Sequence, residues 1–123
     1  MKTFVAVLCI FGCSIASAWA TPRDMTVDFS WIGSTLCAPR PISPEFRVGD
    51  VPAGTHSLRF ALIAPTGREL GGSDVVLPAN GTVPKGTVQF RPPCVGGMYT
   101  WTVDAIDVDG KTLASARLTR PFY

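Results

Sequence analysis

The chain of 123 residues is 46% hydrophobic and 16% charged, and its formal net charge at neutral pH is +2. Basic and acidic residues form no runs, so nucleic acid and anionic membrane surfaces are not expected partners. A chain of this length corresponds to one domain.

The N-terminus has the pattern of a secretory signal. Lys2 supplies a positive charge, residues 4–15 are apolar, and Ala18-Trp19-Ala20 fits an A-x-A cleavage site. We therefore predict a signal peptide over residues 1–20, a mature domain over residues 21–123 and a periplasmic or secreted location. A lipoprotein signal that uses Cys13 is the alternative. No other segment is long and apolar enough to predict a membrane span.

Cys37 and Cys94 are the two cysteines that remain after cleavage at Ala20. In an oxidising compartment an even pair favours a disulfide, and two separate buried thiols are the alternative. A bridge between them would stabilise the fold by roughly 4 kcal/mol in the chain-entropy model, because it closes a long loop.

The first half of the mature chain predicts three strands. Residues 25–32 alternate, with Met25, Val27, Phe29 and Trp31 on one face. A proline-containing surface crossing follows, and residues 45–48 form a short strand. Residues 58–64 are apolar on both faces after Arg59, which predicts a central strand between two layers.

The second half continues the pattern of strands and turns. Residues 75–77 and 87–91 predict short strands, and Asn80-Gly81 between them is a hairpin signal. Residues 98–108 and 111–119 predict the arms of a hairpin that turns at Asp109-Gly110. No segment shows a sustained helical period. The expected fold is all-β, a small Greek-key-like β-sandwich.

Two motifs stand out in the mature chain. The first is C-A-P-R-P-I-S-P-E-F from Cys37, followed after a short gap by V-P-A-G-T-H-S-L-R-F-A-L from Val51. The second is P-C-V-G-G-M-Y-T-W-T-V-D-A-I-D from Pro93. They resemble the phosphatidylethanolamine-binding protein family, and most closely its bacterial periplasmic Raf-kinase-inhibitor-like branch. They lie in the family's order and cover about half of the mature chain. The resemblance implies a β-sandwich that binds a ligand without catalysis.

The segments that form the family's ligand pocket are missing. The family carries Asp-Pro-Asp-x-Pro after its central strand, His-Trp on the next strand and Gly-x-His-Arg before a Tyr. The corresponding places here read Ala64-Pro65-Thr66-Gly67, Asp74-Val75-Val76-Leu77 and Gly97-Met98. The family's binding residues therefore cannot be carried over, and the ligand-binding residues are unknown from the sequence.

Arg68 and Arg91 are the basic residues nearest to these places. Two exposed arginines would attract a phosphate weakly and in a salt-sensitive way. We therefore predict no specific binding of phosphoethanolamine or of phosphorylated peptides.

The sequence offers little for catalysis. His56 is the only histidine and lies in a turn, and no G-x-S-x-G motif presents a serine beside it. A glycosidase pair of Glu45 with Glu69 or Asp74 is conceivable, but nothing in the sequence places these carboxylates together. We therefore expect a protein that is not an enzyme.

No cofactor or metal is expected either. The spacing of Asp104, Asp107 and Asp109 departs from an EF-hand, so a solvated strand face and turn explains these residues better than a Ca²⁺ loop. Zinc would need several nitrogen or sulfur ligands, and only His56 remains once the cysteines are paired. Nucleotide-binding motifs are absent.

The leading hypothesis is a non-enzymatic exported binding module for an unknown protein or small-molecule ligand. An immunoglobulin-like accessory or structural subunit of an envelope assembly is the alternative, and a hydrolase with an unrecognised site is a further one. Phe122 and Tyr123 either pack against the sandwich or form an exposed docking tail. The sequence leaves the choice between monomer and dimer open.

Overall fold

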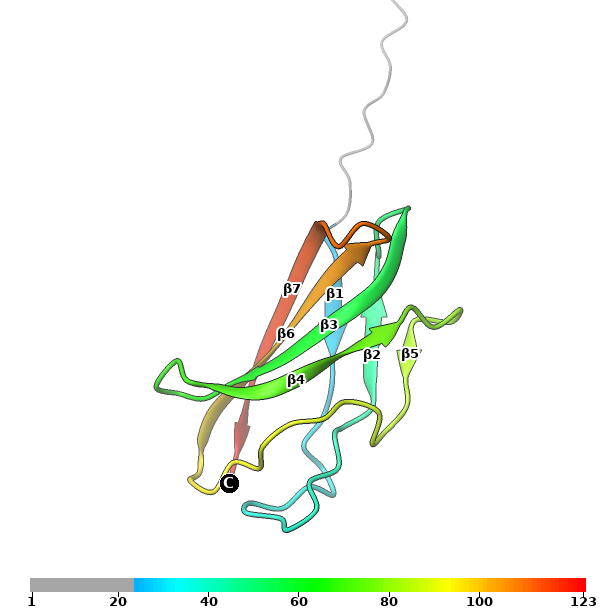
Figure 1. The fold of residues 1–123 in the computed structure, drawn as a ribbon. Helices are drawn as coiled ribbons and strands as arrows, with labels where there is room; N and C mark the ends of the chain where they lie inside the picture. Colours follow the sequence, from blue (N-terminus) through cyan, green and yellow to red (C-terminus); the bar gives the residue numbers. More distant parts are fainter. Residues whose placement is uncertain (1–23) are drawn as a thin grey trace, which may run out of the picture.

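The computed structural model describes residues 24–123, so the predicted signal peptide and its cleavage site lie outside the described residues. The regular elements of this part of the chain are all β-strands (Figure 1). They are β1 (Thr26–Asp28), β2 (Phe46–Gly49), β3 (Thr55–Ile63), β4 (Glu69–Val76), β5 (Thr82–Val83), β6 (Gly97–Asp107) and β7 (Thr112–Phe122). No helix within residues 24–123 has the length and apolar character of a membrane span.

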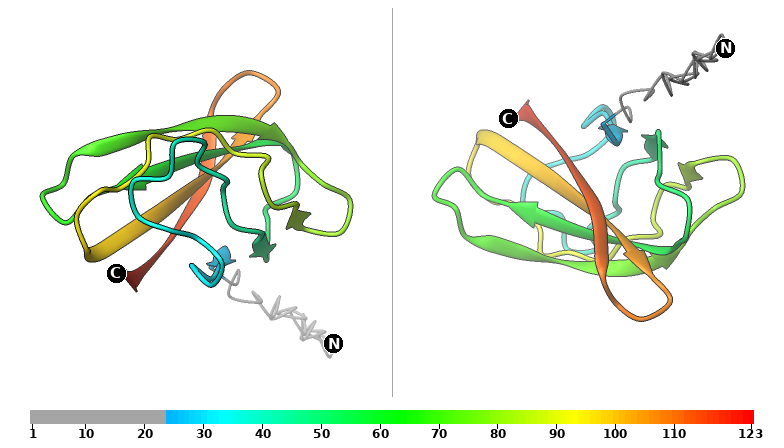
Figure 2. Two further views of the ribbon diagram at one scale, coloured as in Figure 1. Left: turned by 90° about the horizontal axis from the view of Figure 1, so that it is seen from below. Right: turned by 90° about the horizontal axis from the view of Figure 1, so that it is seen from above.

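The strands form two antiparallel sheets that lie one over the other (Figure 2). The smaller sheet has the order β1-β2-β5, and the larger has the order β4-β3-β6-β7. The predicted all-β sandwich is confirmed. Strand β3 pairs with β4 on one side and β6 on the other, which is the central position that its apolar sequence predicted.

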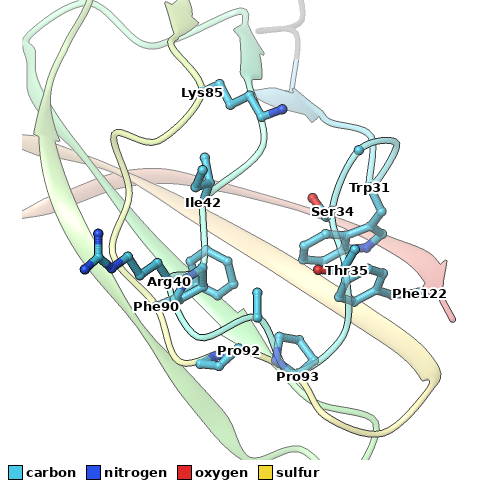
Figure 3. Close-up of a pocket in the computed structure, with 13 residues that line it drawn as sticks. Trp31, Ser34, Thr35, Arg40, Ile42, Lys85, Phe90, Pro92, Pro93 and Phe122 are labelled. Atoms are coloured by element: carbon cyan, nitrogen blue, oxygen red, sulfur yellow. The ribbon is translucent and has the colours of Figure 1, made fainter.

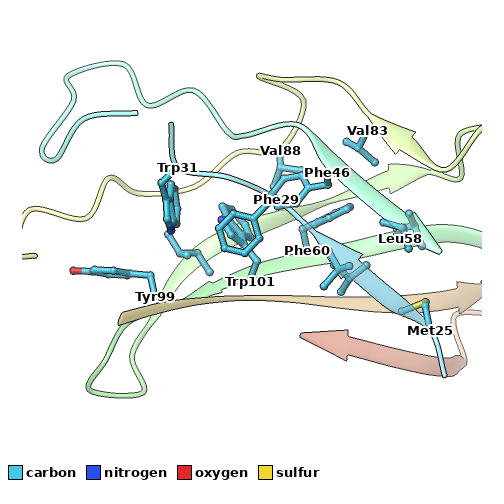
Figure 4. Close-up of a cluster of buried hydrophobic side chains, with 14 of the residues drawn as sticks. Met25, Phe29, Trp31, Phe46, Leu58, Phe60, Val83, Val88, Tyr99 and Trp101 are labelled. Atoms are coloured by element: carbon cyan, nitrogen blue, oxygen red, sulfur yellow. The ribbon is translucent and has the colours of Figure 1, made fainter. Parts of the chain in front are cut away.

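The core lies between the two sheets and is rich in aromatic rings (Figure 4). Phe46 from the smaller sheet contacts Phe60 and Trp101 of the larger sheet, with ring centroids 4.6 and 5.0 Å apart. The predicted core faces are confirmed, because every second residue is buried in both alternating segments, 25–31 and 99–105. These residues are Met25, Val27, Phe29 and Trp31 in the first pattern and Tyr99, Trp101, Val103 and Ala105 in the second.

The predicted C-terminal hairpin is also confirmed. Val103 pairs with Ala116 in the β6–β7 register. At the tip, Gly110 has a φ of +86°, and a side-chain oxygen of Asp107 accepts hydrogen bonds from the Asp109 and Lys111 amides. Strand β7 runs beyond the predicted end, through the penultimate residue of the chain.

The prediction of a strand at residues 87–91 is wrong. The backbone amides of this segment donate mostly to serine side chains and do not form the regular row of backbone hydrogen bonds that defines a strand pair. The Val88 amide donates to the Ser43 hydroxyl, the Gln89 amide to the Ser73 hydroxyl and the Arg91 amide to the Leu70 carbonyl. The segment therefore follows the edge of β4 as an irregular strap.

Asn80-Gly81 forms a turn but not a two-residue hairpin. The Gly81 amide donates to the Pro78 carbonyl, and the Asn80 side chain accepts from the Thr82 amide. The strands on either side of the turn pair in different sheets, β4 with β3 and β5 with β2. The chain thus crosses between the layers at this point.

The predicted strand at residues 25–32 pairs over only three residues, Thr26–Asp28. Its partner β2 begins at Phe46, and the residue two positions earlier is Pro44, which has no N–H to donate. The alternating burial nevertheless continues to Trp31. The side chains of Phe29 and Trp31 therefore pack in the core although their backbone is no longer paired in the sheet.

Candidate binding pocket

A disulfide joins Cys37 to Cys94, as predicted, with the two Cα atoms 4.3 Å apart. The Cys37 amide also donates to the Pro93 carbonyl at 2.7 Å. These two links hold the irregular loop at residues 32–45 against the segment that precedes β6. Two stretches without regular structure are thereby fixed relative to each other at one end of the sandwich.

A pocket of about 120 Å³ lies between these two stretches (Figure 3). We call it the Trp31 pocket. Trp31 and Phe122 lie along one side of it, and Ile42 and Phe90 lie along the opposite side. Its complete lining is Trp31, Gly33, Ser34, Thr35, Ala38, Arg40, Pro41, Ile42, Lys85, Phe90, Pro92, Pro93 and Phe122.

The aromatic wall of the pocket is well ordered by packing. The rings of Trp31 and Phe122 stack with centroids 4.3 Å apart and an interplanar angle of 10°. Trp31 is only 7% exposed, and its indole nitrogen has no hydrogen-bond partner among the described residues. A buried N–H without a partner is unfavourable, so this group is an exception to the usual pairing of buried polar atoms.

The charged residues that line the pocket are Arg40 and Lys85, and no acidic residue lines it. The ion pairs found within residues 24–123 join Arg47 to Glu45, Arg59 to Asp74 and Arg120 to Asp28, so neither pocket cation takes part. The stem of Arg40 lines the wall, and its guanidinium points away from the cavity in Figure 3. Lys85 and the Ser34 hydroxyl lie at the rim.

A second, more open and more polar hollow of about 480 Å³ adjoins the Trp31 pocket and shares Ser34 and Lys85 with it. We call it the Arg120 groove. A guanidinium nitrogen of Arg120 lies 2.8 Å from a carboxylate oxygen of Asp28. This hydrogen bond and the positive charge lower the pKa of Asp28 below its ordinary value of 3.8. The charges of this groove are therefore largely paired, and Lys85 is its unpaired cation.

Gly97 lies against the Pro65 ring between the Pro65 turn and the Cys94 loop, where the family's pocket would lie. A Cβ atom at Gly97 would lie 2.9 Å from the Pro65 ring, so the two residues are in contact. Neither hollow described above is lined by Pro65 or Gly97. The turn is closed by backbone hydrogen bonds between Ala64, Gly67 and Arg68.

The structure does not bring the candidate catalytic residues together. His56 is exposed at the start of β3, nine residues before Pro65, which corresponds to roughly 30 Å along an extended strand. Glu45 pairs with Arg47 beside the smaller sheet. Asp74 pairs with Arg59 on the larger sheet, so Glu45 and Asp74 form no carboxylate pair.

Asp104 and Asp107, two of the three aspartates near the C-terminal hairpin, serve local structure. Asp104 accepts a hydrogen bond from the Ser115 hydroxyl on the neighbouring strand, and Asp107 caps the hairpin turn. Within residues 24–123 no group of three or more His, Cys, Asp or Glu side chains is arranged to hold a metal ion.

The two arginines considered for phosphate binding both lie at the turn between β3 and β4. Arg68 is exposed in that turn. The Arg91 side chain donates to the carbonyl of Glu69, the residue after Arg68, which holds it at the edge of β4.

Sequence reasoning missed the Trp31 pocket. The alternating pattern correctly placed Trp31 in the core, but it gave no sign that Trp31 also lines a cavity. It also left the place of the C-terminal aromatics open. In the structure Phe122 is buried in the pocket wall and Tyr123 is 82% exposed. Lys85 carried no signal, because it lies in a short turn with no motif around it.

No protein-family model and no curated protein matches this sequence. Among solved structures, the chain is similar to that of a phosphatidylethanolamine-binding protein homologue from Chlamydia trachomatis, with a TM-score of 0.59. The match covers 81% of this chain and 97% of that chain at 17% identity. The resemblance seen in the sequence motifs is therefore confirmed at the level of the fold, which is phosphatidylethanolamine-binding-protein-like.

Proposed function

We propose that this protein is an exported, non-enzymatic binding module that has lost the anion pocket of its fold family and binds a small ligand in the Trp31 pocket. The observation that carries this proposal is the pocket itself. It is preformed, lined mainly by aromatic, proline and aliphatic side chains, and held by the Cys37–Cys94 disulfide. A concave apolar cavity with a few polar groups at its rim is the usual form of a small-molecule site.

Export is supported by the signal-like pattern of residues 1–20 and by the disulfide, since disulfides persist in oxidising compartments.

The loss of the family's anion pocket is supported by three features. The turn at Pro65 carries no acid, its ring contacts Gly97, and Arg91 is engaged by the backbone of β4. A phosphate group needs several convergent donors in a shielded hollow, and these features argue against such a site at this place.

Calorimetry tests the loss of the anion pocket. We expect no measurable heat of specific binding when phosphoethanolamine is titrated into the protein at physiological salt. Arg68→Ala and Arg91→Ala should leave that result unchanged. A saturable one-to-one isotherm that either substitution abolishes would show that the anion pocket has been rebuilt from other residues.

The non-enzymatic assignment is supported by the position of His56, which is exposed at the end of the sandwich opposite the Trp31 pocket. A general base must lie within hydrogen-bond reach of the group that it activates. A screen of ester and phosphoester substrates tests it, and we expect no turnover above the buffer rate. Turnover that His56→Ala removes would overturn this part of the proposal.

A further inference from the structure

We infer that the ligand of the Trp31 pocket is a small aromatic monocarboxylate, whose ring enters the apolar cavity and whose carboxylate binds Lys85 and Ser34 at the rim. This inference rests on the proposed function, because it assumes that the Trp31 pocket is a binding site. It adds the chemical class of the ligand and the residues that select it.

The size and walls of the cavity select the apolar part of the ligand. The volume of about 120 Å³ is close to the roughly 150 Å³ of an engineered apolar cavity that binds benzene, so it suits a single six-membered ring. The stacked rings of Trp31 and Phe122 form one wall, and Phe90 and Ile42 face them. Aromatic rings interact favourably with such walls in offset or edge-on arrangements, so a flat ring fits better than a branched chain.

The polar groups select the charge of the ligand. The lining holds no carboxylate, and Lys85 is the lining cation that an anion at the rim can reach, because the Arg40 guanidinium points away from the cavity. Lys85 and Ser34 are common to the cavity and to the Arg120 groove, which places them where the two hollows meet. A carboxylate there accepts a charge-assisted hydrogen bond from the ammonium group and a second bond from the hydroxyl.

The neighbouring charges explain why one negative charge is preferred to two. In the Arg120 groove, Asp28 and Glu45 are paired with Arg120 and Arg47, so Lys85 is the cation left over. A monoanion neutralises it. A phosphate dianion would bring one negative charge more than this single unpaired cation neutralises.

The two buried indole groups provide a direct readout. The N–H groups of Trp31 and Trp101 are both buried and without partners, but only Trp31 lines the cavity. A ligand in the Trp31 pocket should therefore shift the indole resonance of Trp31 more than that of Trp101, whose ring centroid lies 6.3 Å behind that of Trp31.

The experiment is an NMR titration of the ¹⁵N-labelled, disulfide-bonded protein recovered after export. The probes are phenylacetate, phenylacetamide as its uncharged match, acetate as its ringless match and phenyl phosphate as the dianion. We expect a saturable shift of the Trp31 indole resonance with phenylacetate at the lowest concentration. Phenylacetamide should bind about tenfold more weakly, which is the value of one charge-assisted hydrogen bond. Acetate should also bind more weakly because it has no ring to fill the apolar cavity, and phenyl phosphate because its second charge has no cation to pair with.

Variants assign the charge recognition to its residues. Lys85→Met and Ser34→Ala should each weaken phenylacetate binding, Lys85→Met by about tenfold. Lys111→Met is the matched control, because Lys111 is an exposed lysine in the C-terminal hairpin, far from the pocket, and should leave binding unchanged. Preserved Trp101 resonances report that each variant is folded.

The outcomes separate this inference from the proposed function. If phenylacetamide shifts the Trp31 resonance as strongly as phenylacetate, or if Lys85→Met binds like Lys111→Met, the pocket binds ligands but the inferred charge selection is wrong. If phenyl phosphate binds best, the ligand is an aromatic phosphate instead. If no probe shifts the Trp31 resonance at millimolar concentration, both the inference and the proposed use of this pocket are wrong.

Discussion

The hydroxyl group of Ser43 accepts a hydrogen bond from the Val88 amide at 3.0 Å, and Ser43 is completely buried. The Gly86 amide donates to the Ser43 carbonyl as well. The serine of the Ser-Pro motif therefore fixes the segment at residues 84–91, which carries Lys85 and Phe90 to the Trp31 pocket. Ser43 thus positions two of the residues that line the pocket.

Replacing Ser43 by Ala should lower the free energy of unfolding by about 1–3 kcal/mol, because the buried Val88 amide loses its acceptor. Urea denaturation measures this. Ser30→Ala is the control, since its hydroxyl accepts only from the exposed Ile32 amide, which water can satisfy. If the two variants lose the same stability, the buried hydrogen bond does not hold the strap.

Removing the disulfide by Cys37→Ala with Cys94→Ala should lower the free energy of unfolding by about 4 kcal/mol in the chain-entropy model, because the bridge closes a loop between residues 57 positions apart. Denaturation of the double variant and the wild type measures the difference. Mass spectrometry of unreduced protein should give a mass lower than the dithiol by two hydrogen atoms. Stoichiometric titration of free thiols in the native protein would contradict the bridge.

Replacing Gly72 by Ala should destabilise the protein by about 3 kcal/mol or more, because a Cβ atom at this position would lie 1.7 Å from the Phe60 carbonyl oxygen. The strands β3 and β4 would have to separate. Thermal or urea unfolding monitors the loss. Val76→Ala on the same strand is the control, since Val76 is 72% exposed and its truncation should cost less than about 1 kcal/mol. Equal effects would mean that the strands adjust around the added methyl group.

The ion pair between Asp28 and Arg120 should make a small, pH-dependent contribution to stability. Its arginine partner lowers the pKa of Asp28, so the folded protein holds the carboxylate in its charged form more strongly than the unfolded chain. The contribution is present above the ordinary value of 3.8 and disappears as the pH falls through the lower folded-state pKa.

Asp28→Asn tests this contribution. The difference in unfolding free energy between wild type and variant should be below about 1 kcal/mol at pH 7, because both side chains are partly exposed. It should shrink as the pH falls below about 4. A difference that stays constant down to pH 2 would show that the carboxylate acts through its shape and not its charge.

Most of the fold could be predicted because its signals are local. The alternation of Leu58, Phe60 and Leu62 marks a buried strand, and Asp109-Gly110 marks the hairpin that pairs Val103 with Ala116. The segment at residues 87–91 has strand-like residues as well, but Ser43 and Ser73 capture its amides, and this competition arises only in three dimensions.

The Trp31 pocket could not be predicted for a related reason. Alternation shows that Trp31 faces inward, but whether an inward ring meets other side chains or empty space depends on what lies opposite. Ile42 comes from a proline-containing stretch without periodicity, and Phe90 comes from a segment whose predicted strand does not form, so the sequence did not place either residue opposite Trp31.

The stack between Trp31 and Phe122 joins the two ends of the described chain, one just after the first strand and the other at the end of the last. Contacts between such distant positions form slowly, since almost the whole chain must be brought together before they stabilise anything. The pocket should accordingly be among the last parts of the molecule to assemble during folding. A nascent chain that stops short of Phe122 could build much of both sheets and still be unable to hold a ligand.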